Sequence, residues 1–245
     1  MKHLVKLEIL RALRNKKFMF FSVIYPPLLY LLIAGRNGDA VLPGLDVSMS
    51  LYYMVAMAAF GAMTAVVLGN SERIAKEREL GWVRQLRLTA LPGRGYVGAK
   101  VASAATLSLP SIVLVLLTGA GVMGVRLDAW QWVALALCSW AGSFVFAALG
   151  VAIGYLATGD AVRPIAMLVY FALAFGGGLL MPSVVMPDWV QHIGDWLPTH
   201  AYTALGRAVE RGQAPHAGDV GLLAGYLVLF AGAAAWLYRK DTRTT

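Results

Sequence analysis

Long apolar segments without a charged side chain set the strongest limit on the fold of this chain. Six of them contain no Asp, Glu, Lys, Arg or His: Phe18–Ala34, Leu51–Gly69, Val101–Val122, Trp130–Ala157, Pro164–Met181 and Val220–Tyr238. A helix over Leu51–Gly69, at 1.5 Å per residue, is roughly 28 Å long, which is about the thickness of a bilayer's hydrocarbon core. Only 14% of the residues are charged, against about 25% in soluble domains. The sequence therefore predicts an all-α integral membrane protein with six transmembrane helices in a single domain, residues 1–245.

The basic residues indicate which way the chain crosses the membrane. With both termini and residues 70–100 on the cytoplasmic side, 17 Lys and Arg residues lie inside and 4 outside, as the positive-inside tendency requires. We therefore expect a multi-pass protein of the plasma membrane with cytoplasmic N- and C-termini. Because the basic residues flank membrane spans, the net charge of +8 reflects orientation, and we expect no nucleic-acid partner.

Two further segments are expected to lie at the membrane surfaces. Residues 1–17 carry six basic residues and are expected to form a helix on the inner surface, against lipid headgroups. Pro182–Gly212 combines short half-apolar stretches with prolines and is expected to form a re-entrant pair of helices in the outer leaflet. We expect Asp188 and Gln191 to cap the first of these helices, Thr199 to cap the second and Gly212 to end it. Within the fourth span, Gly150 and Gly154 stand four residues apart, which permits close approach of another helix.

The stretch Asn70–Lys100 separates the second and third spans and carries ten charged residues, seven of them basic. We interpret it as a cytoplasmic loop. Glu72 and Lys76 stand four residues apart, in the order that stabilises a helix, and Gly81 is expected to end or turn that helix. The simplest alternative is a solvated loop that only sets the orientation of the chain.

The side chains of this loop also fit a contact with another protein. We expect Glu77 and Glu79 to offer carboxylates to basic residues of a partner, and Trp82 to offer an apolar surface of the kind found at binding hot spots. Three glutamates and a tryptophan are more than orientation requires. The loop therefore predicts a site where a soluble protein docks.

The residues that are missing exclude several function classes. The six spans have no Asp, Glu, Lys, Arg or His, which disfavours proton-coupled transport, and no cluster of metal ligands, so we expect neither catalytic nor metal-binding residues. The nearest approach to a phosphate-binding loop, Gly93 to Lys100, lacks the Gly-Lys-Ser/Thr ending. The chain is therefore not expected to be an enzyme or to bind a cofactor. Energy for uphill transport must come from another polypeptide.

Two motifs resemble one family of membrane proteins. The run from Glu77 to Arg87 (ERELGWVRQLR) lies between spans 2 and 3, and Gly176–Gly178 is followed by Pro182 and Leu197-Pro198. Both are similar to signatures of permeases of type-2 ATP-binding-cassette (ABC-2) exporters. The chain departs from that pattern where Thr89-Ala90-Leu91-Pro92 replaces the usual Thr-Pro and where Trp82 replaces the usual Thr.

The resemblance implies partners and a coupling site. It implies two copies of an ABC ATPase subunit, which bind ATP and Mg, and a second permease copy, here a homodimer in the lipid membrane. A coupling helix between spans 2 and 3 would dock on the ATPase. The candidate coupling residues, which combine this motif with the charged pair before it, are Glu72, Lys76, Glu77, Arg78, Glu79, Gly81, Trp82 and Arg84.

The resemblance further implies a pathway lined by spans 2 and 5. The candidate lining residues lie at helical spacings on these two spans: Met54, Met57, Phe60, Thr64, Phe171 and Phe175. The alternative is that they pack between helices or face lipid. An uncharged route suits export of a hydrophobic or amphipathic, drug- or antibiotic-like small molecule. Export of a lipid or lipid-linked glycan, or a non-transporting scaffold or immunity protein, remains open at this point.

Overall fold

Helices make up most of the residues that the computed structural model describes, 14–42, 47–81, 93–157 and 159–244, and no strand occurs among them. In chain order the elements are α2 (Lys16–Met19), the π-helical segment η1 (Phe20–Ile24), α3 (Tyr25–Ala34), α4 (Met49–Met63), the π-helical segment η2 (Thr64–Leu68), α5 (Gly69–Glu79), α7 (Gly93–Gly121), α8 (Ala129–Leu156), the 3-10 turn η3 (Gly159–Ala161), α9 (Val162–Gly176), the 3-10 turn η4 (Ser183–Val185), α10 (Asp188–Gly194), α11 (Pro198–Glu210) and α12 (Ala217–Thr244). The expected interfacial helix over residues 1–17 falls almost entirely outside the described residues.

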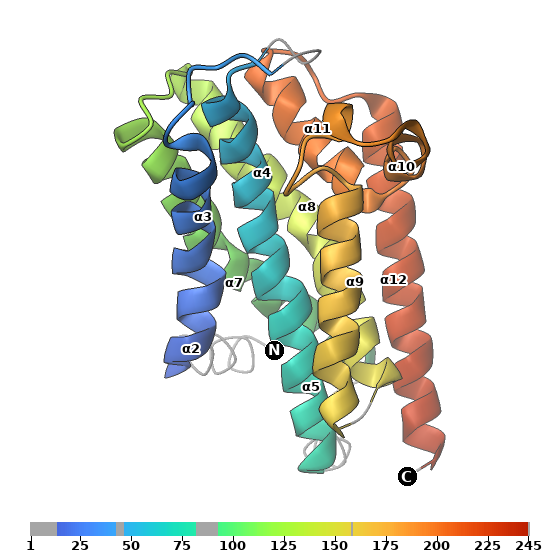
Figure 1. Ribbon diagram of the computed structural model, residues 1–245. Helices are drawn as coiled ribbons and strands as arrows, with labels where there is room; N and C mark the ends of the chain where they lie inside the picture. Colours follow the sequence, from blue (N-terminus) through green and yellow to red (C-terminus); the bar gives the residue numbers. More distant parts are fainter. Residues whose placement is uncertain (1–13, 43–46, 82–92, 158, 245) are drawn as a thin grey trace.

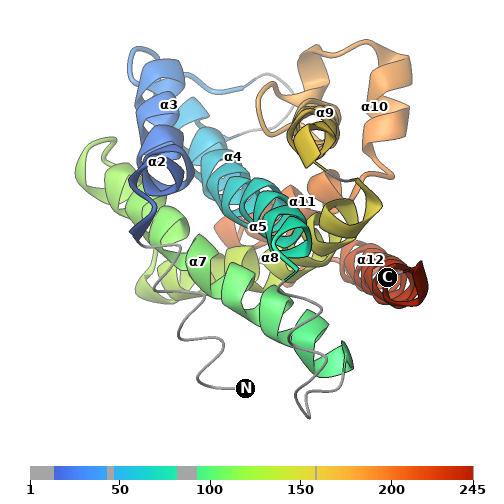
Figure 2. The same ribbon diagram turned by 90° about the horizontal axis from the view of Figure 1, so that it is seen from below.

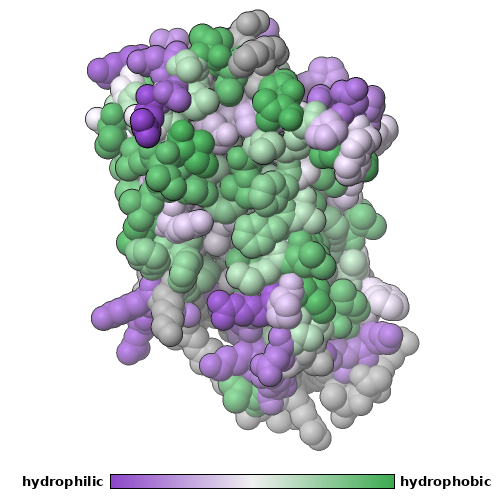
Figure 3. All heavy atoms as spheres, in the orientation of Figure 1, coloured by the Kyte–Doolittle hydropathy of each residue, from purple (hydrophilic) through white to green (hydrophobic). Residues whose placement is uncertain are grey.

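The long helices form a bundle with an apolar middle. Among the described residues, five helical segments are long and apolar enough to cross a membrane: Met49–Glu79, Gly98–Gly121, Ala129–Leu156, Gly159–Gly176 and Ala217–Asp241. The first expected span forms a shorter apolar helix, Phe20–Ala34, which runs beside α4 (Figure 1). A band of hydrophobic side chains lies between two polar ends of the molecule (Figure 3). The part of the chain that the structure describes is therefore that of an all-helical membrane protein with five long candidate spans.

One helix lies at the centre of this bundle. α4, η2 and α5 join into one helical segment from Met49 to Glu79, and 89% of its most apolar window is buried, against 11% for Ala217–Asp241. Seen from the end that carries α2 and α5, it is surrounded by the other helices (Figure 2). Its many alanines and glycines let neighbouring helices approach closely. We refer to Met49–Glu79 as the central helix.

The central helix extends beyond the expected end of the second span. The sequence predicts a span that ends at Gly69 and, in the loop that follows, a separate helix that Gly81 ends. Instead, one continuous helix runs from the span to Glu79, and α7 already begins at Gly93. The first and last parts of the expected loop are therefore helical. The reason is tertiary packing, because Ile74 and Ala75 are buried and continue the apolar face of the helix below the membrane-spanning part.

Gly150 and Gly154 are the points where α8 meets the central helix. A Cβ atom at Gly150 would lie 2.4 Å from the carbonyl oxygen of Val66, and one at Gly154 would lie 2.8 Å from Cβ of Ile74. Any larger residue would therefore push the two helices apart. The expectation of a close helix approach at this glycine pair is confirmed.

The chain between α9 and α12 covers one end of the bundle. This end lies opposite the C-termini of α5 and α12 (Figure 1). The two short helices expected there are α10 and α11, and Gly212, at φ +65°, follows the end of α11 as predicted. α11 is fixed to α8, because the Tyr202 hydroxyl donates to the carbonyl of Ser139 (2.5 Å) and the Gln131 amide donates to the carbonyl of Val209 (2.9 Å). α11 is therefore part of the packed bundle.

The residues that cap the N-termini of α10 and α11 differ from those expected from the sequence. Asp188 was expected to cap α10 together with Gln191, but Pro187 is the capping residue and Gln191 donates to the carbonyl of Met186 instead. Thr199 was expected to cap α11, but its hydroxyl donates to the carbonyl of Leu173, at the end of α9 (2.7 Å). In both cases a side chain that suits a local cap is used for a contact elsewhere.

Candidate functional site

The end of the central helix carries the charged residues that the sequence marks as a docking site. α5 ends at Glu79, Leu80 is its C-cap, and Gly81 follows with φ +67°. This left-handed conformation is inexpensive only for glycine, so the prediction that Gly81 ends the helix is confirmed. Two other predicted residues, Trp82 and Arg84, lie outside the described residues.

Glu77 does not face outward as expected. Its side chain is buried, and the Lys100 ammonium, which is also buried, donates to its carboxylate at 2.5 Å. The pair joins α5 to the first part of α7. The expectation that Glu77 offers its carboxylate to a partner protein is therefore wrong, because α7 supplies the cation within the same chain.

Arg78 joins the end of α5 to two more helices. Its guanidinium donates to Asp241 of α12 at 2.5 Å and to the carbonyls of Gly154 (3.1 Å) and Ala157 (2.9 Å) at the end of α8. It also lies 5.4 Å from the centre of the Tyr155 ring. The last carbonyls of a helix have no partner within it, so Arg78 completes the C-terminus of α8. Arg78 is thus a structural link between helices.

The other predicted coupling residues are exposed. Glu72 pairs with Arg163, next to the start of α9, at 3.4 Å, so it does not use Lys76 as the sequence suggested. Such exposed pairs contribute about 0–1 kcal/mol. Lys76 and Glu79 are exposed, and Leu80 is 70% exposed. We call Lys76, Glu79 and Leu80 the exposed turn.

Sequence reasoning missed the partners of these charges. Lys100 stood out only as the last charge before an apolar span, and Asp241 only as the single acid of a basic tail. Neither pattern says which helix the side chain meets. What the structure adds is that Glu77, Arg78 and Glu72 tie the end of the central helix to α7, α8, α12 and the start of α9.

The six candidate pathway residues do not form one surface. Four of them, Met54, Met57, Phe60 and Thr64, are buried in the core of the chain. The Thr64 hydroxyl is hydrogen-bonded to the Tyr170 hydroxyl of α9 at 2.6 Å. Their side chains fill the space between packed helices, which corrects the expectation that they line a pathway.

The two candidates on α9 are placed differently. Phe171 is 44% exposed and Phe175 is 50% exposed, and their ring centres lie 6.5 Å apart. Met167 and Leu168 are exposed on the same helix. Beyond Arg163 in its first turn, α9 therefore presents an uncharged, partly aromatic face at the surface of the bundle.

This arrangement suits the transmission of movement between helices better than the catalysis of a reaction. Within the described residues no three His, Cys, Asp or Glu side chains come together. Instead, a short exposed turn sits at the end of the most buried helix, and three polar links join that helix to its neighbours. A force on the turn would act on several helices at once.

Comparison with known proteins adds two findings. The family described as "ABC-2 type transporter" matches residues 1–210. A protein of Bacillus subtilis (strain 168) named "Putative transport permease YvfS" is 31% identical over 234 residues, which cover 96% of this chain and 95% of that protein. Both matches include the central helix and the exposed turn.

Proposed function

This chain belongs to the ABC-2 type transporter family, and from that premise we propose that it is the permease subunit of an ATP-driven exporter. The family implies an ABC ATPase as partner. On this proposal the chain itself has no enzymatic role, and the partner binds ATP and Mg and hydrolyses the nucleotide. The chain lies in the plasma membrane with both termini in the cytoplasm, as the distribution of its basic residues favours.

The observation that carries this proposal is the uninterrupted central helix. It is the most buried of the candidate spans and ends in the exposed turn. Lys76 and Glu79 offer one charge of each sign, and Leu80 offers an apolar side chain, to the surface of an ATPase. Glu77 and Arg78 hold the turn against α7, α8 and α12. Closure of the ATPase would therefore move the bundle through this turn.

The exposed face of α9 supports a pathway between two copies of the chain. Only 22% of the apolar window of Gly159–Gly176 is buried, and Phe171 and Phe175 project from it. In a homodimer with two ATPase subunits, this face would meet its counterpart across a central route. Because the described side chains on it carry no charge, the cargo is a hydrophobic or amphipathic small molecule, of the drug or antibiotic type.

Reconstitution with the ATPase tests the proposal. The chain is purified with its cognate ABC ATPase, inserted into liposomes and assayed for ATP-dependent movement of a panel of lipophilic dyes and antibiotics. We expect transport, and we expect Lys76→Ala with Glu79→Ala to weaken binding of the ATPase about tenfold, since a few residues dominate most interfaces.

Two controls make the result decisive. Gln213→Ala, at the other end of the bundle, should leave ATPase binding unchanged. Stable assembly of the two proteins without ATP-dependent movement of any compound would contradict the export function and indicate a scaffold. Normal binding by the Lys76/Glu79 variant would remove the exposed turn as the docking site.

A further inference from the structure

An open pocket lies at the end of the bundle away from the exposed turn. Its volume is about 400 Å³, within the range of about 300–1,000 Å³ typical of small-molecule sites. One face of α11, the chain that follows it, the start of α12 and Ser183 of η4 form its walls. The polar side chains in these walls are mostly basic, and none of them belongs to the coupling site described above.

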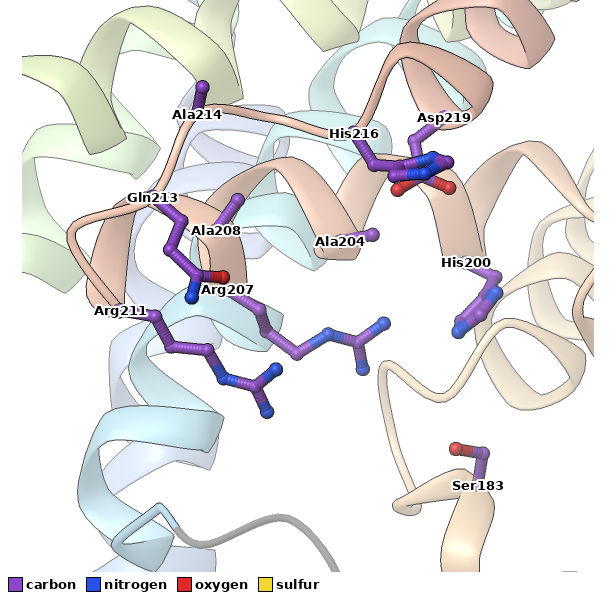
Figure 4. Close-up of a pocket in the computed structure, with 10 residues that line it drawn as sticks. All are labelled: Ser183, His200, Ala204, Arg207, Ala208, Arg211, Gln213, Ala214, His216 and Asp219. Atoms are coloured by element: carbon purple, nitrogen blue, oxygen red, sulfur yellow. The ribbon is translucent and has the colours of Figure 1, made fainter.

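Two arginines point into this pocket. The side chains of Arg207 and Arg211 run side by side into the same open space, with Ser183 across from them (Figure 4). They stand four residues apart on α11 and its cap, so the helix places both on one face. Paired guanidinium groups match the oxygens of a phosphate, because each offers several N–H donors in a plane.

Arg207 has no hydrogen-bonded or ion-paired acid among the described residues. Its side chain makes no hydrogen bond of any kind within that part of the chain. Burial of the side chain lowers the pKa of Arg207, because it disfavours the charged form. A charge that has lost much of its hydration and has no partner is unfavourable. An anion that enters the pocket from outside would relieve this cost.

The nearest buried carboxyl group does not fill that role. Both carboxyl oxygens of Glu210 are buried without a hydrogen-bond partner among the described residues, and burial raises the pKa of Glu210 to about 8, against the opposing effect of Arg207 and Arg211. The group is thus mostly protonated at neutral pH. Of the two acids whose charges act on Arg207, this leaves Asp219, which lines the same pocket.

Two other described acids lie beside histidines at this end of the bundle. Asp219 lies beside His216 (Figure 4), and Asp195 lies 3.6 Å from His200, outside the pocket lining. His216 accepts the amide N–H of Gly218 at Nδ1 (3.2 Å), which leaves its Nε2 as a donor. The space between the arginines and Ser183 is therefore lined by donors.

The geometry points to a binding site for a phosphate or phosphodiester group, held by Arg207 and Arg211 with Ser183 as a further donor. Two sources carry this group: the headgroup of an anionic phospholipid and a soluble phosphate. On the orientation proposed above, the pocket opens at the outer surface of the membrane, where both occur. The inference does not depend on which cargo the protein transports.

Titration of the purified full-length chain in detergent tests this site. The probes are dioctanoyl phosphatidylglycerol, inorganic phosphate and, as a lipid without phosphate, dioctanoyl glycerol, with the dissociation constant measured by calorimetry. We expect saturable binding of at least one phosphate probe and none of dioctanoyl glycerol. Binding of the lipid alone identifies a headgroup site, and binding of inorganic phosphate as well shows that the phosphate group is sufficient.

The variants separate this site from general attraction to a basic protein. Arg207→Gln and Arg211→Gln should each weaken binding about tenfold or more, since each removes a charge-assisted hydrogen bond. Arg211 is exposed, so its variant should fold normally even if Arg207→Gln does not. Arg126→Gln removes an exposed arginine outside the pocket and should bind as the wild type does. Equal binding by all variants, or no saturable binding of either phosphate probe, would overturn the inference.

Discussion

The most informative single residues are ionisable side chains that are buried in the protein. Glu77 and Lys100 are buried beside each other at the base of the bundle, and Glu210 is buried near Arg207 at the opposite end. The first pair is matched and links two helices. Glu210 has no hydrogen-bond partner for its carboxyl group among the described residues. These two situations predict different responses to mutation and to pH.

Replacement of Glu77 should destabilise the chain strongly. Glu77→Gln leaves the Lys100 ammonium without its carboxylate, and loss of one partner from a buried pair costs about 3–5 kcal/mol. The double variant Glu77→Leu, Lys100→Met should recover most of that loss, because both charges are gone. Chemical unfolding in detergent measures the difference. Glu79→Gln is the matched control, because Glu79 is exposed in the same turn, and a Glu77→Gln variant as stable as this control would contradict the burial of the pair.

The buried carboxyl of Glu210 predicts a pH dependence of stability. Burial raises the pKa of Glu210 from 4.5 to about 8. The folded state therefore binds a proton that the unfolded state releases between these pH values. Stability from this group is fully present below about pH 4.5 and is lost as the pH rises to about 8, on the order of a few kcal/mol. Thermal unfolding from pH 4.5 to 9 should show this loss for the wild type and a smaller loss for Glu210→Gln, and equal slopes would contradict it.

At the scale of helices, the contact of α8 with the central helix depends on glycine. A Cβ atom at Gly150 would meet the backbone of Val66 at 2.4 Å. Gly150→Ala should therefore destabilise the protein by about 1–3 kcal/mol. Gly225→Ala is the matched control, because no heavy atom lies within 4 Å of its added Cβ. Alanine is the better helix former by about 1 kcal/mol, so this control should be neutral or stabilising. Equal unfolding midpoints for the two variants would show that the helices do not touch at Gly150.

The helices themselves could be predicted from the sequence, whereas their limits and partners could not. Charge-free segments of bilayer length located the apolar helices, and Gly81 and Gly212 correctly marked two helix ends. The continuity of this helix with the second span was missed, because charged residues hid the buried face formed by Ile74 and Ala75. Local patterns report composition along one helix, and packing between helices decided these cases.

The candidate site could likewise be predicted only in part from the sequence. The sequence correctly located a charged turn between two spans, but it could not distinguish Glu77, which is buried, from Glu79, which is exposed two residues later. The Lys100 and Asp241 partners come from distant parts of the chain. The prediction that residues of the second span line a pathway was wrong for a related reason. A shared helical face does not show whether that face meets solvent or another helix.

For the whole molecule, the two polar ends have distinct roles in our account. One end carries the exposed turn, where the proposed ATPase docks, and the other carries the basic pocket beside α11. The central helix is the most buried of the candidate spans, and it ends at the exposed turn. A signal from the ATPase therefore has a direct structural route into the bundle.

The most direct test of this account is site-specific cross-linking to the ATPase. A photoreactive side chain is placed at position 76, in the exposed turn, or at position 213, at the opposite end, and each variant is reconstituted with the purified cognate ABC ATPase. Both positions are exposed, so the two variants differ only in the end of the bundle that they probe. We predict an ATPase cross-link from position 76 and none from position 213. A cross-link from position 213, or from neither position in a complex that hydrolyses ATP, would contradict the account.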